Sequence, residues 1–217
     1  MTDTLPITER TRLRRGHKRG DFNRETINAI LDAMPMCHIG YVLDGSPQVM
    51  PTFQWREGNH VYWHASSAGR GIGAAGNQDV CMTVSLLDGL VLARSAMHHS
   101  ANFRSVMIFG KPTKITDPDE KAQKLGNLID ALYPGRNALL RPMTAQENKA
   151  TAVLSLPIEE ASAKIRSGGP VDDDEDYSLP IWAGVVPVKM QLLPVEADPR
   201  NLDGVEIPDH IQDIKIG

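Results

Sequence analysis

The sequence predicts a mainly β protein with flanking helices, folded as a barrel or a sandwich. Short runs of β-forming residues alternate with turn residues through most of the chain. Two Asp-Gly pairs, at 44–45 and 88–89, lie between such runs, which is typical of β-hairpins. A stretch with helical spacing of apolar residues lies before the strands, and an acidic helix start lies among them. We therefore expect a sheet built mainly from hairpins and covered by helices.

Composition favours a protein that acts on a small molecule. The 217 residues are 41% hydrophobic and carry a net charge of −4, which is enough apolar material for one core and gives no basic footprint for nucleic acid or a membrane surface. Cys37 and Cys81 make no disulfide or zinc pattern and are interpreted as core residues. No apolar run is long enough to span a membrane, and residues 1–10 do not resemble a signal peptide. We expect a soluble, cytoplasmic protein.

The chain divides into three parts by composition. Residues 1–22 form a basic arm, 23–193 a single domain, and 194–217 an extended tail rich in proline. The basic arm is interpreted as solvated, because no aromatic residues are interleaved with its cations as in a nucleic-acid-binding segment. Those cations are Arg12, Arg14, Arg15, Lys18 and Arg19.

The elements follow in order from the spacing of apolar and turn residues. Apolar residues at helical spacing predict a helix over 23–34, with Asn23 as its cap, and Asp117 with the acidic residues after it predicts the start of a helix over 117–133. The predicted strands are 37–43, 49–56, 61–64, 80–86, 90–94, 106–115, 152–158, 163–166 and 181–193. We expect a turn at 88–89 and a solvated acidic loop at 172–176.

The stretch from 59 to 70 has the chemistry of an anion site. A predicted strand ends in small residues, where the Ser66 and Ser67 hydroxyls can donate to phosphate oxygens and the forked guanidinium of Arg70 suits phosphate geometry. The Gly-x-Gly-x-x-Gly pattern that follows at 71–76 does not predict a dinucleotide fold, because the next strand begins four residues later and leaves no room for a crossover helix. We expect a loop and a short helical turn there.

The histidines do not predict a metal site. His60 and His64 share a strand face but lie about 13 Å apart at ~3.3 Å per residue, too far to hold one ion. His98 and His99 are adjacent and point to opposite sides of an extended chain. No nucleophile elbow is present. Polar residues at 100–106 could hydrogen-bond a planar heterocycle, and Trp182 is a large aromatic near a glycine.

The ordered set of segments resembles the FMN-binding split β-barrel proteins related to pyridoxamine phosphate oxidase, in the branch that includes nitroimidazole-resistance reductases. The resemblance runs from about Arg12 to Ile211. The matching segments are 47–52, 61–70, 87–94, 98–106, 162–166 and the residues around Trp182. Phe103 stands where that family usually has tyrosine, and Ala68 where a polar residue is common.

The resemblance implies an FMN cofactor at the interface of a homodimer. It places the ring edge along Val49, Met50, Pro51 and Thr52, continued by His64, Ala65 and Ser66. It implies phosphate contacts from Ser67 and Arg70. The residues that the neighbouring subunit would lend, or that would lie near the cofactor, are Asn102, Arg104, Ser105, Val106, Lys164 and Trp182. His64 is the candidate catalytic side chain beside the flavin.

The function predicted from the resemblance is an FMN-dependent oxidoreductase acting on an unidentified small molecule. The C-terminal arginine and histidine pair that binds substrate in pyridoxamine phosphate oxidases has no counterpart after Leu193, so vitamin B6 oxidation is not expected. One alternative is a flavin-binding carrier or sensor without turnover, since no clear general acid or base is visible. Another is a haem-binding split barrel, for which His64 or His98 would be the axial ligand.

Overall fold

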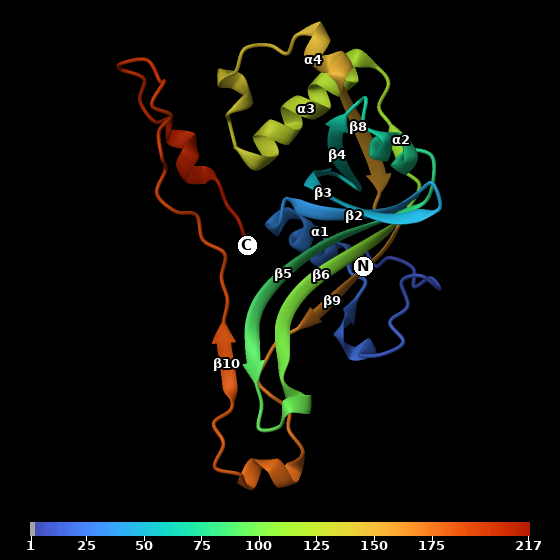
Figure 1. Ribbon diagram of the computed structural model, residues 1–217, viewed down its shortest axis with the longest axis vertical. Helices are drawn as coiled ribbons and strands as arrows, with labels where there is room; N and C mark the ends of the chain where they lie inside the picture. Colours follow the sequence, from blue (N-terminus) through green and yellow to red (C-terminus); the bar gives the residue numbers. More distant parts are fainter. Residues whose placement is uncertain (1–2) are drawn as a thin grey trace.

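The computed structural model describes residues 3–217 and contains one antiparallel sheet with helices around it (Figure 1). Over these residues the sheet has ten strands in the order β1-β9-β6-β5-β2-β3-β4-β8-β7, with β10 paired to β5. The strands are β1 (Gly20–Asp21), β2 (Met36–Leu43), β3 (Ser46–Glu57), β4 (His60–Ser66), β5 (Val80–Leu92), β6 (Ser100–Gly110), β7 (Thr113–Lys114), β8 (Thr151–Pro157), β9 (Glu160–Arg166) and β10 (Gly184–Pro187). The predicted class, mainly β with flanking helices in a split barrel, is confirmed.

The helices pack against different parts of the sheet: α1 and α2 contribute to the main core, and α3 packs on the sheet in a second apolar cluster. The α-helices are α1 (Arg24–Ala33), α2 (Arg70–Ala75), α3 (Pro118–Leu132) and α4 (Ala145–Ala150). The 3-10 turns are η1 (His17–Arg19), η2 (Ala96–His98), η3 (Asn137–Leu139), η4 (Asp174–Ser178) and η5 (Asp209–Asp213). Asn23 caps α1 by accepting from the Glu25 amide, and Asp117 caps α3 by accepting from two amides, so the two predicted helix starts are confirmed.

Strand alternation separates an apolar interior from an outer face that α3 covers at Trp55 and Tyr62 and that is otherwise uncovered. Ile39, Met82 and Ile108 are fully buried within the largest core cluster, together with Ile27 and Leu31 of α1. On the opposite face of the sheet, Val49 and Phe53 of β3 are 68% and 41% exposed. Met36, Val42, Leu87 and Met107 are further exposed apolar residues of β2, β5 and β6.

The first three strands of the predicted meander are confirmed, with β2, β3 and β4 adjacent in the sheet. Asp44 and Gly45 both have positive φ, 51° and 76°, as a tight hairpin turn with the right twist requires. The glycine pattern at 71–76 forms the short helix α2 in place of a crossover unit.

The second predicted hairpin turn, at 88–89, is wrong. The chain continues through it as a single strand, β5, with a β-bulge between Leu87 and Gly89. Gly89 is needed for a different reason: a Cβ there would lie 3.0 Å from a Val185 methyl and 3.2 Å from the Val186 carbonyl oxygen of β10. An Asp-Gly pair therefore marks a close approach between strands at this position.

Two other strand boundaries differ from the prediction. The run predicted at 106–115 is β6, which begins at Ser100, because its polar residues pair with β5 and β9. The run predicted at 181–193 contains only the four residues of β10, because pairing with β5 stops at Pro187 and the Val188 amide makes the last bond, to the Asp88 carbonyl. Beyond that point the tail leaves the sheet.

Figure 1 shows that β5 and β6 extend well below the rest of the sheet, with β10 alongside and η4 at the lower end. We call this part, residues 87–104 with 167–187, the β-extension. From β10 the tail runs back up, separate from the sheet for much of its length in this view. Its last residue returns to α1, where the Gly217 amide donates to the Ala33 carbonyl.

Candidate functional site

The predicted ring-edge residues lie on β3, next to β4. Val49 and Pro51 are exposed on the outer face, whereas Met50 and Thr52 are half-buried. The Thr52 hydroxyl donates to the His64 carbonyl at 3.4 Å, which ties the two strands where the sheet turns outward. The exposed apolar side chains can contact the face of a planar heterocycle, and the half-buried polar residue at the end of the strand can bond to its edge.

His64 has an unsatisfied ring nitrogen. Its side chain is half-buried on the face of β4 that also carries Tyr62, and its Nδ1 is buried without a hydrogen-bond partner in the described part of the chain. Burial lowers the pKa of the imidazole, so the ring is neutral at neutral pH. A buried orphan nitrogen is costly unless a ligand completes it. A hydrogen-bonding ligand beside His64 would remove that cost.

The predicted phosphate contacts follow directly along the chain. Ala65 is half-buried against the core, whereas Ser66, Ser67 and the side chain of Arg70 are exposed. Arg70 starts α2 and has only a distant ion pair, 4.0 Å from the Asp44 carboxylate, with both side chains 82% exposed. Its guanidinium is therefore available to an anion. The residues from β3 to α2 form one contiguous group, which we call the β3–β4 group.

The second predicted group lies on β6 and β9, and we call it the β6–β9 group. Asn102 bonds Arg166 and the Gly168 carbonyl, and the Ser105 hydroxyl donates to the Lys164 carbonyl at 3.3 Å. Arg104 donates to both oxygens of Asp88, at 3.2 and 3.0 Å from Nε and 2.8 Å from Nη2, and this raises its pKa. Its charge is thus already balanced within the chain.

Val106 and Trp182 were also predicted to lie near the cofactor, but their side chains do not lie with the β6–β9 group. The side chain of Val106 is fully buried in the core and cannot reach a ligand on the outer face. Trp182 lies on the β-extension, 69% exposed, with its ring folded against Gly184, where a Cβ would come within 2.8 Å of it.

A single chain does not bring the β3–β4 group and the β6–β9 group together. In the sheet, β2 and β5 lie between β3 and β6. Strands in a sheet are spaced about 4.8 Å apart, so the two groups are separated by three strand spacings, roughly 14 Å. Both groups nevertheless border the same uncovered outer face.

The β-extension contains a polar cluster around Ser95. The Ser95 carbonyl accepts from the His98 amide and lies 2.9 Å from the His99 Nδ1, and the Ser95 hydroxyl lies 3.1 Å from the His98 Nδ1. A carbonyl can only accept, so His99 Nδ1 carries the proton and its Nε2 is left with a lone pair when the ring is neutral. His99 itself is exposed.

Asp172 fixes this cluster to the segment before β10. Its fully buried carboxylate accepts from the Arg94 amide and guanidinium, both at 2.9 Å, and lies 3.7 Å from His98. The hydrogen bonds from Arg94 keep the pKa of Asp172 below its ordinary value despite burial. The predicted solvated acidic loop is therefore wrong at Asp172, since that residue is an internal partner of Arg94.

The fold and these sites can be placed among known proteins. Residues 23–165 match the family described as pyridoxamine 5'-phosphate oxidase. The chain belongs to this family. The resemblance inferred from sequence is thereby confirmed, and the split-barrel sheet is the family's fold. A comparison with curated protein sequences gives no match.

Two solved structures are similar to this protein over nearly the whole chain. The flavocytochrome Anf3 from Azotobacter vinelandii is 53% identical, with 97% of this chain and 98% of that one covered at a TM-score of 0.95. An FAD and haem binding protein from Mycobacterium smegmatis is 32% identical, with 91% and 97% covered at a TM-score of 0.87. A candidate 5-nitroimidazole antibiotic resistance protein from Bacteroides thetaiotaomicron, 24% identical over 66% of this chain and 84% of that one, shares the fold at a TM-score of 0.56.

Sequence reasoning missed two functional candidates on the β-extension. His99 was not singled out, although Ser95 four residues earlier is the kind of residue that can fix a histidine ring. His98, Asp172 and Asp176 have ligand atoms within 4.8 Å of one another, a grouping that no local spacing indicates because the histidine and the two carboxylates are far apart in the sequence. We assign no metal there, because Arg94 already neutralises Asp172.

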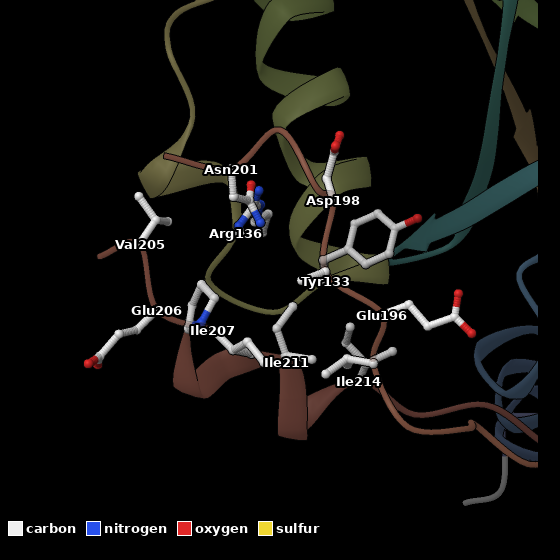
Figure 2. A pocket seen from close by; sticks show the side chains of 13 residues that line it. Tyr133, Arg136, Glu196, Asp198, Asn201, Val205, Glu206, Ile207, Ile211 and Ile214 are labelled. Carbon is white, nitrogen blue, oxygen red and sulfur yellow. The ribbon is translucent and has the colours of Figure 1, made fainter. Parts of the chain in front are cut away.

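The cavities lie mostly away from the predicted residues. Figure 2 shows one of about 500 Å³ between the end of α3 and the tail, lined by Tyr133, Arg136 and Ile211 among others. None of the predicted site residues lines it. Arg104 lines a different hollow of about 520 Å³, shared with Asp88 and with residues 188–190, which follow β10. No helix in residues 3–217 is long and apolar enough to cross a membrane.

Proposed function

We propose that this chain is a homodimeric redox protein of the pyridoxamine 5'-phosphate oxidase family that binds a flavin and a haem and acts as an oxidoreductase on a small molecule. The likeness to a flavocytochrome and to an FAD and haem binding protein supports both cofactors. When bound, a flavin exchanges one or two electrons and a haem exchanges one, so the pair can connect a two-electron donor to a one-electron step.

The β3–β4 group supports the flavin. His64 offers a buried ring nitrogen without a partner among the described residues, and Ser67 and Arg70 offer exposed phosphate donors. The sequence resemblance predicts FMN. We propose FAD, because the 32% identical structure is an FAD and haem binding protein. Mass analysis of the flavin released from the purified protein by heat distinguishes FMN from FAD. If the released flavin is FMN, the sequence prediction is correct and the FAD proposal is wrong.

The separation of the two groups supports the proposed dimer. The β3–β4 group and the β6–β9 group border one outer face but lie on opposite sides of β2 and β5. A second copy placed across that face would bring one group of each chain opposite the other group of its partner. Exposed apolar residues such as Val49 and Met107 on this face would be covered at the same time.

The tautomer of His99 carries the haem assignment. Metal-bound histidines commonly donate the second ring nitrogen to a carbonyl, which fixes the ring and leaves the other nitrogen free to bind iron. The Ser95 carbonyl holds His99 in that state, and His99 is exposed. The neighbouring Met97, 86% exposed, adds an apolar surface of the kind a porphyrin contacts. We therefore propose that His99 would hold the haem iron through Nε2, in place of His64 or His98.

A His99→Ala variant tests the haem assignment. Haem content, measured from the Soret band and by pyridine haemochrome analysis, should fall at least tenfold, whereas the flavin spectrum should be retained. His60→Ala is the matched control, since His60 is an exposed histidine on β4 away from the β-extension, and its haem content should equal that of the wild type. An unchanged Soret band in His99→Ala would refute the ligand. A colourless wild-type protein that binds neither added flavin nor haemin would refute the function.

A further inference from the structure

A second cavity, of about 470 Å³, lies between α1, β3, the end of α3 and the tail. Its wall is mostly apolar and combines segments that are distant in the sequence, among them Phe53 and Trp55 of β3, Leu132 of α3, and Leu192 and Ile214 of the tail. None of the residues predicted to bind the flavin lines it. Cavities of this size hold small organic molecules in proteins. It is therefore a candidate binding site separate from the flavin residues.

Gln54 brings an unsatisfied polar atom to this cavity. The residue is 2% exposed and lines the cavity, and its Nε2 donates to the Leu31 carbonyl at 2.7 Å and to the Met34 carbonyl at 3.0 Å. Two carbonyls around one end of the amide require its NH2 group there, which makes the other end the oxygen.

That oxygen, Gln54 Oε1, is buried and has no hydrogen-bond partner among the described residues. A buried acceptor without a donor costs free energy, because folding has removed it from water and returned nothing. A ligand that donates one hydrogen bond to Oε1 would offset this cost.

The charged groups of the wall do not favour an ion. Arg56 donates from Nε and Nη2 to the two carboxylate oxygens of Asp32, at 2.8 and 2.5 Å, so the two charges balance each other. Lys215 is exposed, and its ammonium group can remain in water. The wall therefore favours an uncharged ligand.

Aromatic side chains favour a flat ligand. Phe53 and Tyr133, which both line the cavity, are 41% and 39% exposed, so part of each ring is free to be covered. The Trp55 Nε1 already donates to the Glu57 carboxylate at 2.8 Å, so the indole contributes only apolar surface. Flat rings pack well against aromatic side chains.

We propose that this cavity binds an uncharged aromatic molecule with a hydroxyl or N–H group, which donates a hydrogen bond to Gln54 Oε1. The ring packs among the apolar side chains of β3, α3 and the tail. This site goes beyond the proposed function, because its residues are not those assigned to the flavin or the haem and binding requires neither cofactor.

Calorimetric titration of the full-length protein as purified tests the proposal with a pair of ligands. 2-Naphthol has a hydroxyl donor, whereas 2-methoxynaphthalene has the same ring system without one. 2-Naphthol should bind roughly tenfold more tightly, the scale of one hydrogen bond to a buried acceptor. Equal affinities, or no binding of 2-naphthol, would overturn the proposal. Tighter binding of 2-naphthoate than of 2-naphthol would also overturn it, since the cavity would then select an anion.

A pair of tail variants tests whether the ligand lies in this cavity. Leu192 lines it and is 50% exposed, whereas Leu193 is 78% exposed and is not among the lining residues. Both lie in an extended part of the tail, so the fold should persist in each variant. Leu192→Asn should weaken 2-naphthol binding about fivefold, the scale of losing a partly buried leucine contact. Leu193→Asn should bind like the wild type. Unchanged affinity in Leu192→Asn would overturn the assignment to this cavity.

Gln54→Met tests the acceptor itself. The variant keeps a side chain of similar length but lacks Oε1, so its preference for 2-naphthol over 2-methoxynaphthalene should disappear. A preference retained in the folded variant would overturn the role of Gln54. Because Gln54 also bonds two carbonyls of α1, the ligand pair and the tail variants decide the proposal if Gln54→Met does not fold.

Discussion

His64 illustrates how the environment of one residue decides its protonation. Histidine ordinarily titrates near pH 6.5. Burial lowers the pKa of His64, and no described residue supplies a hydrogen bond to its Nδ1. The side chain is therefore uncharged in the folded protein. Its Nδ1 either accepts or donates one hydrogen bond, depending on the tautomer. That is the property a flavin edge would use.

A His64→Gln variant tests this protonation state in the flavin-free protein. Because folding lowers the pKa of His64, the unfolded chain binds the proton first as the pH falls. The free energy of unfolding should thus be unaffected by His64 above about pH 6.5 and should decrease below it. Urea unfolding between pH 7.5 and 5 should show a shallower decline in His64→Gln. An equally steep decline in both proteins would contradict a buried neutral His64.

At the scale of elements, the β-extension depends on the contact of β10 with β5. Four residues of β10 pair with β5, and the ring of Trp182, which precedes β10, lies against its first residue, Gly184. Asp172 then bonds Arg94 near the other end of the β-extension. These contacts hold the segment that carries His98 and His99 against the segment 167–187.

Gly89→Ala should weaken that contact. The new methyl would lie 3.0 Å from Val185 and 3.2 Å from the Val186 carbonyl, so β10 has to shift. We expect the unfolding free energy to decrease by about 1–3 kcal/mol, the cost of overpacking a close site. Gly73→Ala in α2 is the control, since a Cβ there meets nothing within 4 Å and alanine favours a helix. Urea unfolding that shows no difference between the two variants would contradict the close approach of β10 to Gly89.

For the whole molecule, the uncovered outer face of the sheet is the main unexplained surface. It carries exposed apolar residues on four strands, and the two groups of predicted flavin ligands border it. Single exposed apolar residues are common on protein surfaces, but a set on one sheet face indicates an interface. A face-to-face homodimer would satisfy both features.

Val49→Glu tests this assembly. In a sedimentation experiment the wild type should have twice the 23.8 kDa mass of the chain. A carboxylate at position 49 should shift the equilibrium from dimer to monomer. Flavin should be lost with the dimer, since the proposed site takes contacts from both copies. Ile7→Glu introduces the same charge at a residue that is 57% exposed but outside the sheet face, and it should remain dimeric. A monomeric wild type with full flavin content would contradict the proposed dimer.

Local signals in the sequence predicted much of the fold. The spacing around Ile27 and Leu31, the Asn23 and Asp117 caps and the Asp44-Gly45 turn all depend on residues close together in the chain. Each was therefore predictable. The Asp88-Gly89 pair has the same local signal but is a bulge, because its glycine packs against β10, which is distant in the sequence.

The candidate site was predicted where its residues are consecutive and missed where they are not. Ser66 to Arg70 follow one another along the chain, so their pattern alone predicted an anion site, and the family resemblance added the ring edge along Val49 to Thr52 of the neighbouring strand. His99 became a candidate because the Ser95 carbonyl fixes its ring. Arg166 is unusual because no carboxylate lies among the described groups that surround it. A side chain's partners across a sheet are set by strand order and register, which composition and spacing do not encode. The sequence by itself thus determined the family and most of the strand pattern, because both depend on residues close together in the chain, whereas only the tertiary structure decided that the Ser95 carbonyl fixes the ring of His99 and that Arg166 is buried with neutral partners.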